Sequence, residues 1–416
     1  MGKTFVEKVI GRNVNREVSV GEIVFVTPDY CISHENTHRI SSLFNTLGTQ
    51  TVYAPERIVV VFDHTVPACL PSHADIHNRV REFVDKQKIT NFYDMNKHGG
   101  VCHQIMCQEG YSAPGLIIAG ADSHTCTAGA MGALAIGIGH TEMASVWATG
   151  QLWVNVPETI RITLTGRFRK HVTAKDLILK IISDIKADGA IYRAIEFDGD
   201  GLENLTIDER MTLCNMGVEM GAKSAACKPS ALIETYCRVH AKNPNWEAIW
   251  ADEDACYEKE LTYCLDEIVP GVAKPHNVDN YAQVKELHDK RINQVLIGTC
   301  TNGRLSDLRL AAEVLEGNQV KVRTIITPAS VQIYKEALLE GTIATLVEAG
   351  CTIVAPGCGA CIGVANGTLG KGEVCLSTAN RNFRGRMGTN EAEIYLASPI
   401  TAAYSAIYGE IRNPYE

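Results

Sequence analysis

Three cysteines near the C-terminal end constrain this chain more than any other feature of its sequence. Cys300 stands in the run Gly-Thr-Cys-Thr-Asn, and Cys358 and Cys361 stand in Pro-Gly-Cys-Gly-Ala-Cys. Each is predicted to lie where a strand ends in a glycine-rich loop. Three thiolates without an obvious fourth ligand favour an iron–sulfur cluster whose open iron is a Lewis acid that substrate can reach.

Two other interpretations of these cysteines stay open at this stage. A Cys-x-x-Cys pair with one distant cysteine is also typical of half a zinc site or of a redox pair. Zinc needs a fourth close ligand, and none is apparent, while redox pairs usually start a helix directly. Gly357, Gly359 and Gly363 instead surround the pair, and glycines let backbone N–H groups turn toward sulfide. Any of the other cysteines among the fifteen is also available to complete a four-thiolate site.

The length and composition are those of a globular protein of two to four domains, with 416 residues, 45% of them hydrophobic. No apolar run reaches the roughly 18–20 residues of a membrane helix, and the start has no apolar signal core. An odd count of cysteines in a long chain indicates reduced thiols. We therefore expect a cytoplasmic protein with no membrane partner. The net charge of −9 disfavours nucleic acid as a partner and calls for a locally basic pocket if the ligand is an anion.

Apolar strand-like runs alternate with amphipathic helix-like runs, which predicts an α/β fold with mostly parallel, buried strands. Strands are expected at residues 57–62, 116–119, 295–298, 322–326, 352–355 and 374–377. Ser330 is expected to cap a helix that stops at Gly341, and Thr342 to begin another that ends at Gly350. The middle of the chain is more polar, with weaker strand signals. We divide the chain into three α/β domains at residues 1–165, 166–286 and 287–416.

Titratable and metal-binding residues follow five of the predicted strands. Ligands of open α/β sheets bind beyond the carboxyl ends of the strands, so these positions are candidate site residues. The Asp63-His64 pair alone is typical of a surface turn, and Asp122-Ser123-His124 alone is typical of a helix cap. Two such Asp/His segments after apolar strands favour acid–base chemistry, because a carboxylate orients an imidazole and holds its pKa near working pH. His103 stands in a similar glycine-flanked context.

The segment 380–386 carries three arginines in six positions, after the last predicted strand. A solvated basic loop is one interpretation. The other is a carboxylate-binding segment, because guanidinium groups bind carboxylates through two hydrogen bonds. That interpretation supplies the basic pocket that an acidic chain needs for an anionic ligand.

Four motifs together resemble the aconitase family. They are Gly-Thr-Cys-Thr-Asn-Gly, Pro-Gly-Cys-Gly-Ala-Cys-Ile-Gly, Asn-Arg-Asn-Phe-Arg-Gly-Arg-Met-Gly and Gly-Ala-Asp-Ser-His-Thr. The length and the run at 391–399 are similar to the large subunits of 3-isopropylmalate dehydratase and its relatives. The resemblance covers essentially the whole chain. It implies an aconitase-like core of three α/β domains around one [4Fe-4S] cluster per large subunit, without the fourth, swivel domain.

The resemblance also implies an activity and roles for residues. The activity is that of a hydro-lyase acting on a small 2-hydroxy di- or tricarboxylic acid, with the cluster bound by Cys300, Cys358 and Cys361. Asp63 and His64 are implied to protonate the leaving hydroxyl. The remaining implied catalytic residues, which act around the open iron, are His103, Asp122, His124 and Glu219. The implied substrate-binding residues, which include partners of the cluster, are His34, Ser123, Asn215, Asn380, Arg381 and Arg386.

A partner and a substrate range follow from the same resemblance. The swivel domain, with the proton-abstracting base, is expected on a separate small subunit in a heteromeric complex. The expected activity is that of 3-isopropylmalate dehydratase, with 2,3-dimethylmalate dehydratase and homoaconitase as alternatives. An RNA-binding role is disfavoured by the acidic charge. An electron-transfer module is disfavoured because it needs four thiolates and no acid–base segments.

Overall fold

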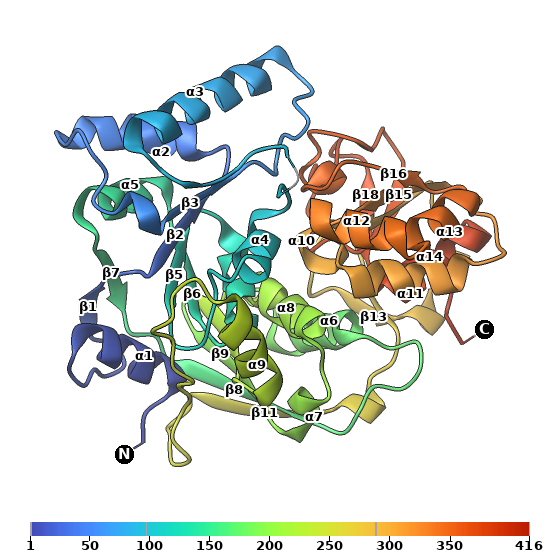
Figure 1. Cartoon of the computed structure of the whole chain (residues 1–416). Helices are drawn as coiled ribbons and strands as arrows, with labels where there is room; N and C mark the ends of the chain where they lie inside the picture. Colours follow the sequence, from blue (N-terminus) through green and yellow to red (C-terminus); the bar gives the residue numbers. More distant parts are fainter. Residues whose placement is uncertain (1, 97, 288, 416) are drawn as a thin grey trace.

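Buried apolar strands form three larger sheets in which parallel pairs predominate, so the predicted α/β architecture is confirmed. The computed structural model describes residues 2–96, 98–287 and 289–415. Figure 1 shows the N-terminal sheet on the left of the view, the C-terminal sheet on the right, and the middle of the chain beneath and between them. A short antiparallel ribbon of β1 (Ile23–Val26) and β7 (Leu152–Asn155) lies beside the first sheet.

The first sheet has five parallel strands in the order β4-β3-β2-β5-β6. Its strands are β2 (Tyr30–Ser33), β3 (Ile58–Val61), β4 (Asn91–Tyr93), β5 (Ile117–Gly120) and β6 (Leu134–Gly137). One face packs on α1 (Phe5–Val14), α2 (Thr37–Phe44), α3 (Pro71–Gln87) and α5 (His140–Thr149). The other face packs on α4 (Cys102–Gln108) and on the short helical segment η3 (Ser123–Met131). Strands 57–62 and 116–119 of the sequence analysis correspond to β3 and β5.

The second sheet lies in the polar middle of the chain, where the sequence signals are weak. It has four parallel strands in the order β10-β9-β8-β11, which are β8 (Thr159–Thr165), β9 (Ala194–Asp198), β10 (Ser224–Cys227) and β11 (Lys259–Cys264). The sequence of β10, Ser-Ala-Ala-Cys, has no β-branched or aromatic residue, and that of β11 begins with two charges. The helices of this region are α6 (Ala174–Ile185), α7 (Asp200–Glu203), α8 (Ile207–Asn215) and α9 (Ala231–His240).

The third sheet has seven strands in the order β13-β12-β18-β17-β14-β15-β16. They are β12 (Gly271–Ala273), β13 (Tyr281–Gln283), β14 (Gln294–Gly298), β15 (Arg323–Thr327), β16 (Thr352–Ile353), β17 (Val374–Ser377) and β18 (Glu393–Leu396). Pairs among β14 to β18 are parallel, while β12 pairs antiparallel with both of its neighbours. The four strands predicted here are all found, although β16 is shorter than expected.

Four helices cover one face of the third sheet. They are α11 (Leu305–Leu315), α12 (Val331–Leu339), α13 (Thr342–Glu348) and α14 (Pro399–Tyr408). The two predicted helices are confirmed as α12 and α13. The Ser330 hydroxyl caps α12 by accepting a hydrogen bond from the backbone N–H of Ile333 at 3.2 Å.

One continuous apolar core joins all three sheets. It contains Val59 of the first sheet, Ile162 of the second and Leu296 of the third, together with helix residues such as Leu177 of α6. Because this core is shared, the three sheets hold fixed positions relative to one another. Strand membership crosses the predicted divisions at 165 and 287, since β8 pairs in the second sheet and β12 and β13 pair in the third. The three-domain division stays a prediction.

Within the part of the chain that the structure describes, no helix combines the length and apolar character needed to cross a membrane.

The buried carboxyl group of Glu196 makes the stability of this core depend on pH. Its two oxygens accept hydrogen bonds from the backbone N–H of Phe5 at 2.9 Å and from the Tyr257 hydroxyl at 3.1 Å. Burial raises the pKa of Glu196 from 4.5 to about 7. The folded state therefore holds a proton that the unfolded state releases, and stability falls as pH rises through this interval. The loss is on the order of 1–3 kcal/mol.

We predict that Glu196→Gln raises the thermal unfolding midpoint above pH 7 and changes it little at pH 5. The neutral amide keeps an acceptor for Phe5 and avoids a buried charge. Unfolding scans of both proteins across this pH range test the prediction, with the exposed Glu253→Gln as control. A parallel pH dependence in wild type and Glu196→Gln contradicts it.

Candidate active site

The fifteen candidate residues lie together at the junction between the carboxyl ends of the first and third sheets. His34 follows β2, Asp63 and His64 follow β3, and Asp122 to His124 follow β5. From the facing third sheet, Cys300 follows β14 and the segment 380–386 follows β17. Each candidate contacts at least one other candidate, so the structure brings all of them into one network. Their chemical roles stay predictions.

The three cysteines are buried, with 7%, 7% and 4% of Cys300, Cys358 and Cys361 exposed. Cys300 lies in the short helix α10 (Thr299–Asn302), not in a loop as the sequence suggested, and Cys361 lies in the helical turn η7 (Gly359–Ile362). A strand end still precedes each segment. Burial raises the pKa of the Cys300 thiol to about 11 and that of Cys358 well above its usual value. Such thiols become thiolates when a metal supplies positive charge.

The spacing of the sulfur atoms separates the metal sites that the sequence left open. Four thiolates around one zinc ion lie about 3.8 Å apart, as tetrahedral geometry and a Zn–S bond of about 2.3 Å require. Among the described residues, no group of three metal-binding side chains with ligand atoms all within 4.8 Å of one another contains a cysteine. The three sulfurs are thus too widely spaced for a single ion, and a larger, multinuclear centre fits them better.

Side chains of segment 380–386 reach the sulfur atoms. The Asn380 amide nitrogen donates to Cys300 Sγ at 3.2 Å, and an Arg386 guanidinium nitrogen donates to Cys361 Sγ at 3.6 Å. Arg386 Nε is buried and has no hydrogen-bond partner among the described residues, which leaves one donor for a ligand. Arg384, the third arginine of the segment, is exposed at the surface. The segment is therefore a site-lining element, and two of its three arginines face inward.

Asp63 and His64 form a tightly bonded pair beside Cys358. The His64 Nδ1 atom lies 2.5 Å from Asp63 Oδ1 and 3.7 Å from Cys358 Sγ. The backbone N–H of Cys102, at the first turn of α4, donates to the other Asp63 oxygen at 2.7 Å. Burial acts against a charged His64, but the charges of Cys358 and Asp63 outweigh it and raise the pKa of His64 well above its usual value. With Asp63 at Nδ1, the Nε2 atom is the one that faces the site, 3.7 Å from Asp122.

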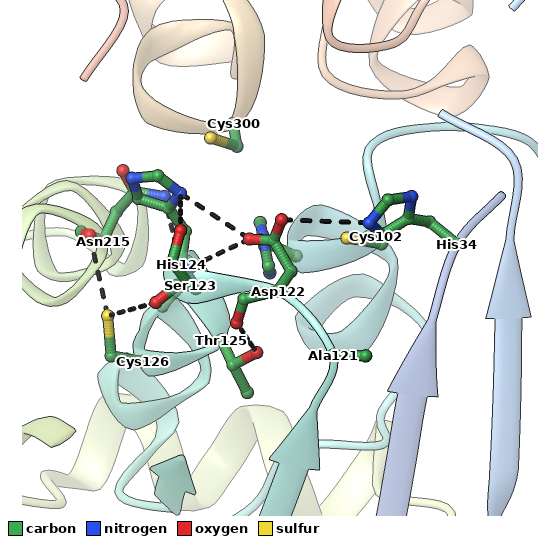
Figure 2. Close-up of polar contacts among 12 residues, drawn as sticks. His34, Cys102, Ala121, Asp122, Ser123, His124, Thr125, Cys126, Asn215 and Cys300 are labelled. Carbon is green, nitrogen blue, oxygen red and sulfur yellow. Dashed lines mark hydrogen bonds and ion pairs between the residues drawn. The ribbon is translucent and has the colours of Figure 1, made fainter. Parts of the chain in front are cut away.

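Asp122 is the centre of the polar network (Figure 2). Its Oδ1 atom lies 2.8 Å from His103 Nε2 and accepts the backbone N–H of His124 at 2.8 Å, so Asp122 also caps a helix, which was the alternative interpretation of this segment. Its Oδ2 atom lies 4.0 Å from His34 Nε2, and the His34 ring stacks on the His64 ring at 3.9 Å. Burial opposes ionisation, but the neighbouring His103 and His124 hold the pKa of Asp122 well below its usual range. One carboxylate is thus bonded to the His103 ring and to the His124 backbone, and it lies within 4.0 Å of the His34 and His64 rings.

The network continues to the middle of the chain through Glu219, in the turn η4 (Met216–Met220) that follows α8. Glu219 Oε1 lies 2.8 Å from His124 Nε2 and accepts from Arg381 Nε at 2.9 Å. Despite burial, His124 and Arg381 lower the pKa of Glu219. Asn215, at the end of α8, accepts from the Asn380 amide at 3.2 Å. Ser123 Oγ lies 3.3 Å from His124 Nδ1. Arg381 is thus ion-paired with Glu219, whereas Arg386 has no ion pair with any residue that the structure describes.

Glu35 belongs to the site, although the sequence analysis did not single it out. Its buried carboxylate accepts backbone N–H groups of Thr65 at 2.8 Å, His64 at 3.2 Å and Asp63 at 3.4 Å, and the Thr65 hydroxyl at 3.1 Å. The hydrogen bonds and charge of His34, with a further bond from His77, overcome burial and hold the pKa of Glu35 well below its usual value. The sequence signal that pointed to Glu35 was its position as an acidic residue next to the candidate histidine His34. The contact of the Cys102 backbone with Asp63 leaves no trace in the sequence.

Comparisons with known proteins give one family for the whole chain. A sequence profile described as the aconitase family (aconitate hydratase) matches residues 7–291 and 280–409. The chain is 47% identical, over all of its length and 99% of the relative, to 3-isopropylmalate dehydratase large subunit 1 of Methanopyrus kandleri. It is 47% identical, over 93% of its length and 98% of the relative, to a probable methanogen homoaconitase large subunit of Methanosarcina mazei. It is 45% identical, over all of its length and 98% of the relative, to the homoaconitase large subunit of Thermus thermophilus.

A solved structure supports the fold at much lower sequence similarity. Aconitase X of Thermococcus kodakaraensis, in its holo-form, matches with a TM-score of 0.52 at 14% identity, over 98% of this chain and 93% of that chain. At this identity the likeness bears on the fold alone.

We predict that Glu35→Gln loosens the loop that carries Asp63 and His64. One acceptor oxygen becomes an amide nitrogen, so two of the four donors lose their partner at a cost of about 1–3 kcal/mol. The thermal midpoint should fall, and hydrogen exchange of the backbone amides at residues 63–65 should accelerate. The exposed Glu56→Gln serves as control. Unchanged exchange at these three amides contradicts the prediction.

Proposed function

The chain belongs to the aconitase family, and from this we propose that it is the large subunit of an enzyme that isomerises a 2-hydroxy dicarboxylic acid by dehydration and rehydration, as 3-isopropylmalate dehydratase does. The chain is a hydro-lyase by its family. The observation that carries the finer proposal is the meeting of three buried cysteines with a carboxylate–imidazole network at one sheet junction. An electron-transfer centre has no need of such a network next to its ligands.

The residues present fit a [4Fe-4S] cluster held by Cys300, Cys358 and Cys361. The sulfurs are too widely spaced for one ion, and Asn380 and Arg386 donate to two of them, as outer hydrogen bonds to cluster ligands do. With three protein ligands, such a cluster supplies one iron as a Lewis acid for the hydroxyl and carboxylate of the substrate. Arg386 Nε, which is buried without a hydrogen-bond partner in the part of the chain that the structure describes, then gains a partner in the cluster or substrate.

His64 is the general acid in this proposal. Asp63 accepts the Nδ1 proton, which fixes the ring orientation and keeps the second proton on Nε2, toward Asp122 and the site. Hydroxide leaves poorly unless it gains a proton as the C–O bond breaks, and His64 Nε2 supplies that proton. The ring of His34, stacked on His64, restricts the donor to one face.

Asp122, His103, His124 and Glu219 hold the departing water in position for its return. The bonds of Asp122 to His103 and of Glu219 to His124 order a chain of hydrogen-bond donors and acceptors within the site. Arg381 fixes Glu219 from the other side. Neutral polar groups are added by Asn215, Ser123 and Asn380. The substrate carboxylates bind to Arg386, which supplies the local positive charge that a chain of net negative charge needs.

A small subunit completes the enzyme in this proposal. All three relatives named above are described as large subunits, which supports a partner that carries the remaining catalytic groups. The names of the relatives include both 3-isopropylmalate dehydratase and homoaconitase, at similar identity. Homoaconitase is therefore the alternative activity, and 2,3-dimethylmalate dehydratase the third substrate to test.

The activity is tested by co-producing the chain with a candidate small subunit, reconstituting it anaerobically, and assaying 3-isopropylmalate, homocitrate, 2,3-dimethylmalate and citramalate. Formation of the unsaturated acid from 3-isopropylmalate supports the leading proposal, and the highest kcat/KM identifies the substrate class. A complex that binds its cluster and dehydrates none of the four acids refutes it.

We predict that Cys300→Ser, Cys358→Ser and Cys361→Ser each abolish cluster binding and activity, because a serine hydroxyl does not replace the thiolate. Iron and sulfide analysis of the reconstituted chains measures the loss. Cys256→Ser, at an exposed cysteine, and Cys227→Ser, at a buried one, should keep wild-type iron content. Full cluster occupancy in any of the three ligand variants overturns the assignment.

We predict that His64→Asn lowers turnover by roughly 10²–10⁴ with the iron content intact, because the general acid is lost. Asp63→Asn should cost less, and the double variant should lose little more than His64→Asn alone, because the two residues act as one unit. Turnover is compared at matched iron content. Near-normal turnover of His64→Asn shows that the pair is a structural turn, with the acid elsewhere.

A further inference from the structure

A fully buried lysine lies behind the segment that contacts the cysteines. Lys175, in the first turn of α6, has 0% of its surface exposed. Its ammonium donates to the backbone carbonyls of Thr378 at 2.8 Å and Ala379 at 2.7 Å. These carbonyls immediately precede Asn380 and Arg381. Lys175 thus connects the middle of the chain to the inner surface of the candidate active site.

The ammonium group of Lys175 has no ion-pair partner among the described residues. Its two acceptors are neutral carbonyls. A cation in the first turn of a helix also opposes the helix dipole. An unpaired buried charge costs several kcal/mol, so such groups are usually paired with an opposite charge.

The acidic groups that act on Lys175 indicate where a compensating charge belongs. Burial lowers the pKa of Lys175 to about 7, and the groups that oppose this effect are, in order, Cys300, Asp307, Cys361 and Glu219. Two of the four are proposed cluster ligands. A 2+ cluster core with three thiolates carries net negative charge. At a buried site, water does not screen this charge.

We propose that Lys175 is a second charge partner of the iron–sulfur centre, beside Arg386: its buried ammonium offsets the negative charge of the three-thiolate cluster and holds the Asn380–Arg381 segment against it. The inference rests on the proposed function, since it needs the cluster to be present. Lys175 touches neither substrate nor reacting atoms, and it acts through the electrostatic field and through the backbone of residues 378 and 379.

Two neutral variants separate the charge from the hydrogen bonds. Lys175→Gln keeps a donor for the carbonyls and loses the charge, whereas Lys175→Met loses both. The matched control is Lys223→Gln, because Lys223 also donates to a carbonyl, that of Gly137 at 2.9 Å, and is partly buried. The carboxylate that acts on Lys223 is that of Glu142, which is not a proposed cluster ligand.

The experiment uses the full chain, reconstituted anaerobically with ferrous iron and sulfide, and follows iron loss to EDTA. We expect Lys175→Gln and Lys175→Met to lose iron at least roughly fivefold faster than wild type, as one missing charge in a medium of low effective dielectric implies. Lys223→Gln should match wild type. The cluster-free Lys175→Gln chain should melt no lower than the wild-type chain, because an unpaired buried charge is gone and a donor remains.

The possible contrary results differ in what they overturn. A wild-type chain that binds no cluster refutes the proposed function itself. If wild type holds its cluster and Lys175→Gln releases iron at the same rate, the charge role is wrong. The charge role is also wrong if only Lys175→Met releases iron faster, because Lys175 then acts through its hydrogen bonds alone. A cluster-free Lys175→Gln chain that melts well below wild type also overturns the proposal, because the lysine then serves the fold.

Discussion

Compensation of buried charge governs the junction at which the first and third sheets meet. Asp63, Asp122 and Glu219 are all largely removed from water, and each is bonded to an imidazole or a guanidinium. In such an environment an unpaired carboxylate is unstable, so each side chain fixes the orientation of the next. The result is a continuous network from His34 to Arg381.

The shared apolar core provides the scaffold for this network. The acid–base residues come from the first sheet, Glu219 and Asn215 from the middle of the chain, and the cysteines from the third sheet. Each group sits at the end of a short, buried strand or helix whose base is anchored in the same core. Because packed cores resist small displacements, the relative positions of groups more than 200 residues apart are defined to within a hydrogen bond. Lys175 is an example behind the site, because the two carbonyls that it bonds are 203 and 204 residues away in sequence.

Strong strand signals and their polar flanks made much of the site predictable. Runs such as Ile58–Val61 and Gln294–Gly298 are apolar and bounded by turn residues, so the sequence locates both the strands and the residues that follow them. Glu35 was not predicted because its role is to accept backbone N–H groups from a loop about 30 residues away. Polar strands such as β11 were hard to recognise in the sequence, because one face of an edge strand is solvated and carries polar residues.

The sequence by itself determined the α/β class, the cysteine set and most of the residues that line the junction, because strand periodicity and ligand type are local properties. It also placed Arg381 and Arg386 in one candidate segment without distinguishing them. Only the tertiary structure decided that Arg381 pairs with Glu219 and that Lys175 is fully buried behind it, and that Arg386 Nε is buried without a partner among the described residues. Such distinctions depend on which groups share a low-dielectric interior, and that is settled by the packing of distant segments.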